Sequence, residues 1–215
     1  MDRFFFFTFL FLFSIPFISA QEKLYEFESA YVKKITTTTG SGVEVITAEE
    51  IFISDFGKKS ASYKNEKRNI KSLKKTEENN SVHILDGDWI ITYDPKTKEG
   101  TKMKNILLGK FKNMSDKDAE KMAKGLKDAL NTETKELGFE TVAGKKCKVT
   151  LAVSSIAGMK TTVKLWTYKN YNMKTESESL GNKVKEEVKV FKEDEKIDKS
   201  KFTIPQNIKI KEVKF

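Results

Sequence analysis

The chain has 215 residues with one histidine and one cysteine, so a two-histidine metal site and an intramolecular disulfide are both excluded. The formal net charge of +9 comes almost wholly from lysines interleaved with acidic residues, and Arg68 is the only arginine beyond residue 20. Because bidentate phosphate recognition favours arginine, we interpret this excess as a solvated lysine-rich surface and expect no nucleic-acid partner. No phosphate-binding glycine loop or dinucleotide motif is present, so we expect no cofactor and no bound metal.

The first twenty residues have the layout of a cleaved secretory signal peptide. Arg3 precedes an apolar run at residues 4–13, Pro16 interrupts it, and the small Ala20 stands at the expected cleavage point. The alternative is an uncleaved anchor, but the run is shorter than the ~20 residues that a spanning helix needs. We therefore predict a signal peptide at residues 1–20 and a single soluble domain at residues 21–215, expected to be a monomer.

Two-residue alternation predicts β-strands from residue 25 to residue 93. The first runs from Tyr25 through the threonine tract at 36–39, before a turn at 40–42. Further strand segments are expected at 43–47, 51–56 and 58–64, with a polar loop at 77–80. Strands at 82–85 and 89–93 flank Asp86-Gly87-Asp88, which is a strong hairpin signal.

The pattern changes to helical spacing between Ser115 and Leu130, where apolar residues recur with lysines and acids between them. Ser115 is the expected N-cap, and Asn131 can end the helix. After residue 138 the two-residue period returns, with strands expected at 139–142, 147–153, 161–168, 184–191 and 208–213. We predict a mainly β fold of roughly ten strands, in which a curved antiparallel sheet forms an unclosed β-barrel and the helix is a lid over its concave face.

Catalytic chemistry has little support in the sequence. His83 alternates with Val82 and Ile84 in a predicted strand, so we interpret it as a surface or satisfied strand residue, and no nucleophile-elbow motif accompanies it. We expect no enzyme activity and name no catalytic residue. We expect the lone thiol of Cys147 to be buried.

Large apolar side chains on the predicted strands and helix have two interpretations. In an ordinary globular protein they form the core. In a curled sheet covered by one helix, they can instead line a concave ligand site. The candidate lining residues are Phe27, Phe52, Trp89, Ile91, Met122, Leu126, Leu165 and Trp166.

Three segments, in this order, resemble the outer-membrane lipoprotein carrier-like proteins of bacteria. The segments are Asp86-Gly87-Asp88-Trp89 through Tyr93-Asp94-Pro95, then Trp166-Thr167-Tyr168-Lys169 with Met173-Lys174-Thr175-Glu176, and Phe202-Thr203-Ile204-Pro205 before residues 208–213. The resemblance implies a periplasmic unclosed β-barrel that holds a lipid or acyl chain, with envelope lipoproteins as further partners. The arginine-proline and phenylalanine-tryptophan signature of the carriers is missing around residues 56–68. We therefore do not assign the carriers' gating arginine to Arg68, and we expect a divergent branch of the family.

Two hypotheses for function follow. The first is a periplasmic carrier that binds a lipid or acyl chain in an apolar trough. The alternative is an envelope interaction or structural protein whose concavity is filled by its own side chains and whose lysine-rich exterior docks on an anionic membrane or glycan.

Overall fold

The protein is a single curved β-sheet in the computed structural model, which describes residues 23–105, 115–156 and 159–213. The expected signal peptide lies outside these residues. The strands are β1 (Ala30–Gly40), β2 (Val43–Ser54), β3 (Lys59–Ile70), β4 (Lys75–Asp86), β5 (Trp89–Asp94), β6 (Glu99–Lys104), β7 (Thr132–Val142), β8 (Lys145–Ile156), β9 (Met159–Tyr168), β10 (Tyr171–Ser179), β11 (Asn182–Glu193) and β12 (Lys209–Val213). The helices are α3 (Asp116–Ala129) and three short 3₁₀ turns, η1 (Asp55–Gly57), η2 (Lys71–Leu73) and η3 (Lys199–Phe202).

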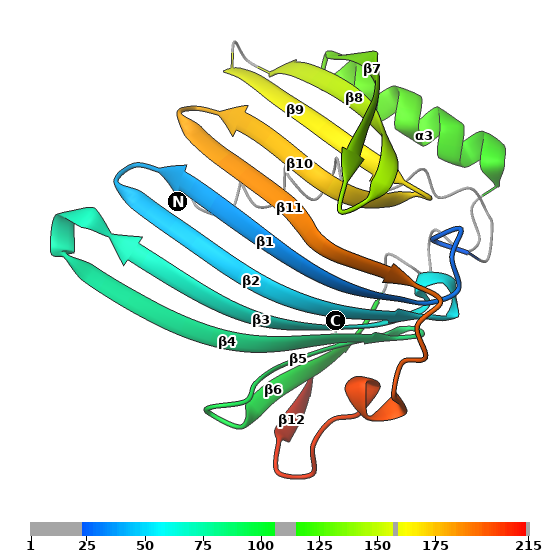
Figure 1. The fold of residues 1–215 in the computed structure, drawn as a ribbon. Helices are drawn as coiled ribbons and strands as arrows, with labels where there is room; N and C mark the ends of the chain where they lie inside the picture. Colours follow the sequence, from blue (N-terminus) through cyan, green and yellow to red (C-terminus); the bar gives the residue numbers. More distant parts are fainter. Residues whose placement is uncertain (1–22, 106–114, 157–158, 214–215) are drawn as a thin grey trace.

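The strand order is β12-β6-β5-β4-β3-β2-β1-β11-β10-β9-β8-β7, and every pair is antiparallel except the parallel pair of β12 and β6. The two edge strands, β7 and β12, are not paired with each other, so the sheet is not closed (Figure 1). The predicted mainly β, antiparallel and unclosed architecture is therefore confirmed. The described residues contain twelve strands. β6 and β10 were not among the expected strands, and the two segments expected at 43–47 and 51–56 form the single strand β2.

One face of the sheet is closed at one end by an apolar cluster. Val32 of β1, Ile51 of β2 and Val188 of β11 share this face by their register, because alternate residues of a strand point to the same side. They pack with residues of β7 and β8 because the sheet curls over, so we call this the inner face and the cluster the closed end. Its buried members are Phe27, Ala30, Val32, Ile51, Ile53, Val142, Cys147, Val149, Trp166, Tyr171, Met173, Val188 and Phe191.

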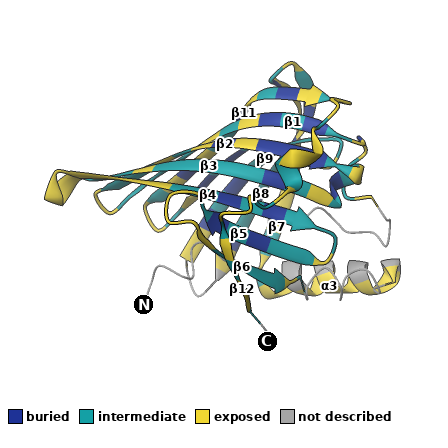
Figure 2. Ribbon diagram, turned by 90° about the horizontal axis from the view of Figure 1, so that it is seen from below, coloured by how far each residue is buried: buried dark blue, intermediate teal, exposed yellow. Residues whose placement is uncertain are grey.

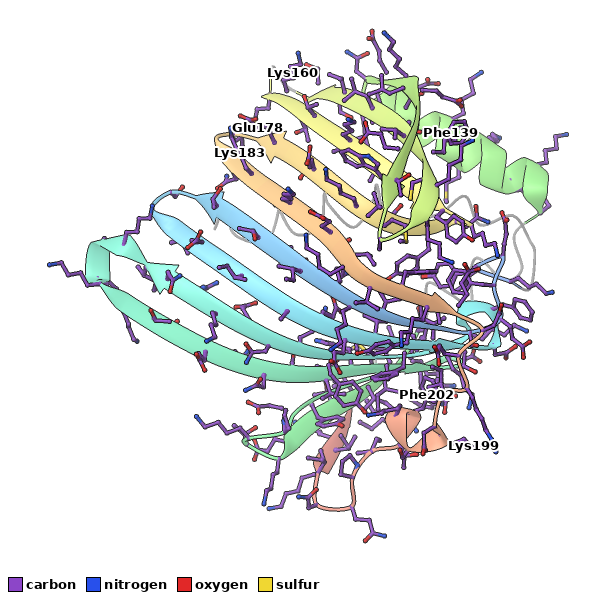
Figure 3. The ribbon with its side chains drawn as sticks, viewed as in Figure 1. Phe139, Lys160, Glu178, Lys183, Lys199 and Phe202 are labelled. Atoms are coloured by element: carbon purple, nitrogen blue, oxygen red, sulfur yellow. The ribbon has the colours of Figure 1, made fainter. Side chains whose placement is uncertain are left out.

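The outer face of β3, β4 and β5 carries a second apolar cluster, which the C-terminal segment covers. After β11 the chain crosses this face and brings Phe202, Ile204 and Ile208 against it, as the position of Phe202 in Figure 3 indicates. The Tyr63 hydroxyl donates a hydrogen bond of 2.9 Å to the carbonyl of Lys201 and fixes the crossing. The buried strand residues beneath it are Ala61, Val82, Ile84, Ile91 and Tyr93.

A polar clamp ties the end of β11 to the upper hairpins. Glu193 accepts hydrogen bonds from the Tyr168 hydroxyl at 2.8 Å, from Lys169 Nζ at 2.6 Å and from Lys145 Nζ. Burial alone would raise the pKa of Glu193, but these three donors outweigh it and lower the pKa to about 2. The clamp holds the curl of the sheet around the closed end.

The predicted helix is present as α3, although its expected position needs correction. Ser115 caps it as expected, since its Oγ accepts a 3.2 Å hydrogen bond from the Asp118 amide, and the left-handed Asn131 follows its last turn. Among the strands, α3 chiefly contacts β7 at the sheet edge. The helix lid over the concave face is therefore not supported, because helical spacing shows which residues share a face but not where the helix packs.

Two other expectations about the strands were wrong. The first strand begins at Ala30, and Tyr25 and Phe27 belong to the preceding segment, where their rings stack at 5.1 Å and cover the closed end. The expected polar loop at residues 77–80 lies inside β4, because the tips of β3 and β4 extend beyond the core and carry polar side chains on both faces. Figure 2 shows this long, largely exposed hairpin.

Candidate functional site

The inner face changes from apolar to charged two residues beyond the closed end along β1 and β2. Lys34 of β1 lies opposite Glu49 of β2, and Glu49 lies opposite Lys64 of β3. Lys34 Nζ is 3.1 Å from Glu49 Oε2 and 3.1 Å from Glu186 Oε2, while Lys64 Nζ is 3.4 Å from Glu49 Oε1. These four side chains form what we call the inner ion group.

Both central members of this group are shielded from solvent, with exposed fractions of 15% for the Lys34 side chain and 8% for Glu49. Burial by itself raises the pKa of Glu49, but Lys34, Lys64 and the donating Ser62 hydroxyl outweigh it and lower the pKa. Burial lowers the pKa of Lys34, and Glu186, Tyr171 and Glu49 reverse this so that the net shift is upward. The ionised pair therefore persists at neutral pH and separates the closed end from the rest of the inner face.

Beyond the inner ion group, the part of the inner face formed by β8 to β11 carries small apolar side chains. Val163 pairs with Ala152 and with Ser177, Ser177 pairs with Val184, and Leu165 lies two residues from Val163 on the same face. Ala152, Val163 and Val184 are buried, yet they belong to neither of the two core clusters of the described residues. We call these five residues the inner wall.

The facing part of the inner face, on β3 and β4, is charged. Glu66 pairs with Asn79, and Arg68 pairs with Glu77. Together with Glu78 these residues line a cavity of about 390 Å³. The inner face thus combines an apolar wall with a charged one, which is the arrangement that an amphipathic ligand requires.

Three described hairpin turns lie at the same end of the sheet, opposite the closed end, and we call this end the open rim. They join β1 to β2, β3 to β4 and β10 to β11, and the adjoining ends of β8 and β9 lie there too, as Figure 1 shows. Leu73 and Leu180 stand at two of these tips with exposed fractions of 67% and 68%. Lysines surround them, including Lys71, Lys74 and Lys183, and Figure 3 labels Lys160 and Lys183 on this rim.

A second cavity, of about 490 Å³, lies mainly on the outer face. The alternation of the strands places most of its lining there, and it mixes charged, amide and apolar groups. Its outer-face residues include Lys33, Ile35, Ala48, Glu50, Tyr63, Asn65, Asn80 and Val82. None of the residues predicted to bind a ligand lines this cavity.

The structure separates the eight predicted site residues. Phe27 and Trp166 are buried in the closed end, and Leu165 belongs to the inner wall. By register, Phe52, Trp89 and Ile91 lie on the outer face, where Ile91 joins the outer cluster and Phe52 packs between the rings of Tyr31 and Tyr63.

Two more of the predicted residues belong to α3. The side chain of Met122 is partly exposed, and that of Leu126 lies outside the described part of the structure. Phe27 and Trp166 therefore belong to the closed end and Leu165 to the inner wall, and Leu165 and Trp166, consecutive in β9, point to opposite faces of that strand. The role of all three in binding stays a prediction.

His83 and Cys147 have the satisfied environments that the sequence indicated. His83 Nδ1 is 3.0 Å from Thr92 Oγ1 and its Nε2 is 3.2 Å from Ser81 Oγ, and burial followed by the charge of Lys64 lowers its pKa. Cys147 is fully buried, and burial raises the pKa of its thiol. Within the described residues, no group of three or more histidine, cysteine or carboxylate side chains is placed to hold a metal ion.

Sequence reasoning missed the inner ion group and the inner wall. Lys34 follows Val32, and Glu49 precedes Ile51, at the two-residue spacing of a strand. A charged residue on an otherwise apolar face was therefore a visible signal in each strand. Their pairing across β1 and β2 depends on register, which the separate strands do not reveal.

The described residues form one open, curved β-sheet. No family model matches the chain, and no curated protein matches it. In the described part of the chain, no helix has the length and apolar character needed to cross a membrane.

Several solved structures are similar at low identity. A structure of the MucA/MucB complex of Pseudomonas aeruginosa matches with a TM-score of 0.47 and 10% identity over 94% of this chain and 62% of that one. PNGF-II matches with a TM-score of 0.41 and 15% identity over 86% of this chain and 31% of that one. LprF from Mycobacterium bovis matches with a TM-score of 0.38 and 10% identity over 86% of this chain and 92% of that one. This chain thus spans less than two thirds of the first two chains, and the resemblance to lipoprotein carriers stays a prediction.

Proposed function

We propose that the protein is a non-catalytic periplasmic carrier that binds the acyl chain of a lipid against the inner wall. The observation that carries this proposal is the division of the inner face into a small-residue apolar wall and a charged wall. An acyl chain on Val163, Val184 and Leu165 would be removed from water, which contributes about 0.8 kcal/mol per methylene. The polar headgroup would face the charged wall of β3 and β4.

The test is acyl-chain binding by variants of the inner wall. Native mass spectrometry of protein purified from its own host is expected to show a co-purified lipid, and a fluorescent acyl probe is expected to bind. Leu165→Ala should weaken binding of the probe because it removes apolar area from the inner wall. Ile46→Ala, on the exposed outer face of β2, should leave probe binding unchanged. Absence of both a co-purified lipid and probe binding would rule the proposal out.

A second candidate function is docking on an anionic membrane surface, and the open rim favours it. Leu73 and Leu180 are the most exposed large apolar side chains among those described on the rim, and lysines flank both. Apolar side chains beside cationic ones are the chemistry that recognises an anionic bilayer interface. Vesicle binding that falls steeply with added salt, without any acyl-probe signal, would favour this function over the carrier.

A further inference from the structure

Ser177 is the one polar member of the inner wall. It lies on β10 between Val163 of β9 and Val184 of β11, and its side chain is 7% exposed. Its Oγ is buried and has no hydrogen-bond partner among the described residues. Buried hydroxyls are nearly always hydrogen-bonded, so this one requires an explanation.

The neighbouring hydroxyls show that the wall can satisfy such groups. Two residues closer to the open rim along the strands, Thr161 Oγ1 lies 2.8 Å from Ser179 Oγ, and Thr132 Oγ1 lies 2.7 Å from Ser154 Oγ. Ser177 faces valines on both sides, and valine side chains neither donate nor accept hydrogen bonds. Its donor is therefore unused among the described residues, and because Ser177 and both valines are at most 7% exposed, a ligand reaches it only by displacing what covers the inner wall.

The surroundings define which group fits. A carboxylate or phosphate in this position would lose its hydration and gain one donor, which is a costly exchange. The nearby cation of the inner face, Lys34, is already paired with Glu49 and Glu186. A neutral acceptor inside an otherwise apolar ligand fits better, and the carbonyl that links an acyl chain to its headgroup is such an acceptor.

We infer that Ser177 Oγ donates a hydrogen bond to the carbonyl oxygen of an ester- or amide-linked acyl chain that lies on the inner wall. This inference rests on the proposed carrier function and adds the ligand class: acylated lipids with a carbonyl linkage are preferred over ether-linked lipids and hydrocarbons. The bond sets the position of the ligand along the wall, with the acyl chain against the valines and Leu165.

The first experiment compares two probes that differ only at the linkage. Dipalmitoyl phosphatidylglycerol and its dihexadecyl ether analogue are titrated in detergent against the mature protein. The wild type should bind the ester about 5-fold more tightly, since a net hydrogen bond is worth about 1 kcal/mol. Ser177→Ala should remove this preference, whereas Ser179→Ala should retain it, because Ser179 already pairs with Thr161.

The second experiment needs no ligand. Thermal unfolding of delipidated protein should show an unchanged or raised Tm for Ser177→Ala, because the variant removes an unpaired buried hydroxyl. Ser179→Ala should lower the Tm. A wild type that binds both probes equally, or an ester preference that survives in Ser177→Ala, would overturn the inference while leaving the carrier function standing. Failure of the wild type to bind either probe would overturn both.

Discussion

Lys34 and Glu49 face each other on neighbouring strands of the inner face, with Nζ and Oε2 3.1 Å apart and both side chains shielded from solvent. The same lysine reaches Glu186 on its other side, so one cation joins β2 to β11 through β1. Lys34 and Glu49 stand two residues beyond Val32 and Ile51, which belong to the closed end. This pair therefore marks the boundary between the apolar closed end and the open part of the sheet.

Removal of one partner from this pair should be strongly destabilising. Glu49→Gln leaves Lys34 with Glu186 alone in a buried setting, and we expect a loss of about 3 kcal/mol in the free energy of unfolding. Glu50→Gln is the matched control, because the exposed Glu50 pairs with Lys33 on the outer face, and it should change stability by less than about 0.5 kcal/mol. Urea unfolding measures both, and equal effects would show that the inner ion group has no special role.

The polar clamp predicts an acid-sensitive stability. The pKa of Glu193 is about 2 in the folded protein, below the ~4.3 of an unfolded glutamate. A lowered folded pKa contributes stability that is present above pH ~4.3 and is lost as the pH falls toward 2.

Glu193→Gln should therefore lower the free energy of unfolding by about 1 to 2 kcal/mol at neutral pH, less than the full linkage effect because the lysines of the clamp are partly exposed to solvent. The variant should also lose much of the fall in stability that the wild type shows as the pH drops. Glu195→Gln should keep this fall, because Glu195 is exposed and its 4.0 Å pair with Lys192 is weak. Unfolding measured between pH 2 and pH 7 distinguishes them, and an unaltered fall in stability in Glu193→Gln would contradict the role of the clamp.

Much of the fold follows from the sequence, and the limits have physical causes. The two-residue alternation and the Asp86-Gly87-Asp88 turn predict the antiparallel hairpins, and the Ser115 cap predicts the start of α3, as the structure confirms. Face assignment fails where it depends on distant partners. Ile91 and Phe52 were expected beside a ligand, yet by register they lie on the outer face, and the C-terminal segment, which crosses that face, contributes to the cluster that buries Ile91.

Cys147 should react slowly with thiol reagents in the native protein. Its Sγ donates to the carbonyl of Lys145 at 3.3 Å within the closed end, and burial raises the thiol pKa, so both access and thiolate fraction are low. We expect labelling by a chromogenic disulfide reagent to require opening of the closed end, and to accelerate in Glu193→Gln, which loosens the curl. Rapid labelling of the native wild type would show that the closed end is open to solvent.

Leu180 offers a test in which stability and surface binding change in opposite directions. It has a φ of 49°, a left-handed conformation that asparagine or glycine adopts more readily, and Gly181 follows it in the hairpin turn. Leu180→Asn should therefore stabilise the protein by about 0.5 to 1 kcal/mol. If the open rim docks on membranes, the same change should weaken binding to phosphatidylglycerol vesicles at low salt by about 5-fold, because an apolar anchor is lost.

Leu137→Asn is the matched control for vesicle binding, since Leu137 is exposed in the middle of β7 and away from the rim. It should bind vesicles like the wild type. Equal vesicle binding by wild type and Leu180→Asn, together with the expected gain in stability, would remove the open rim as a docking surface while confirming the turn strain.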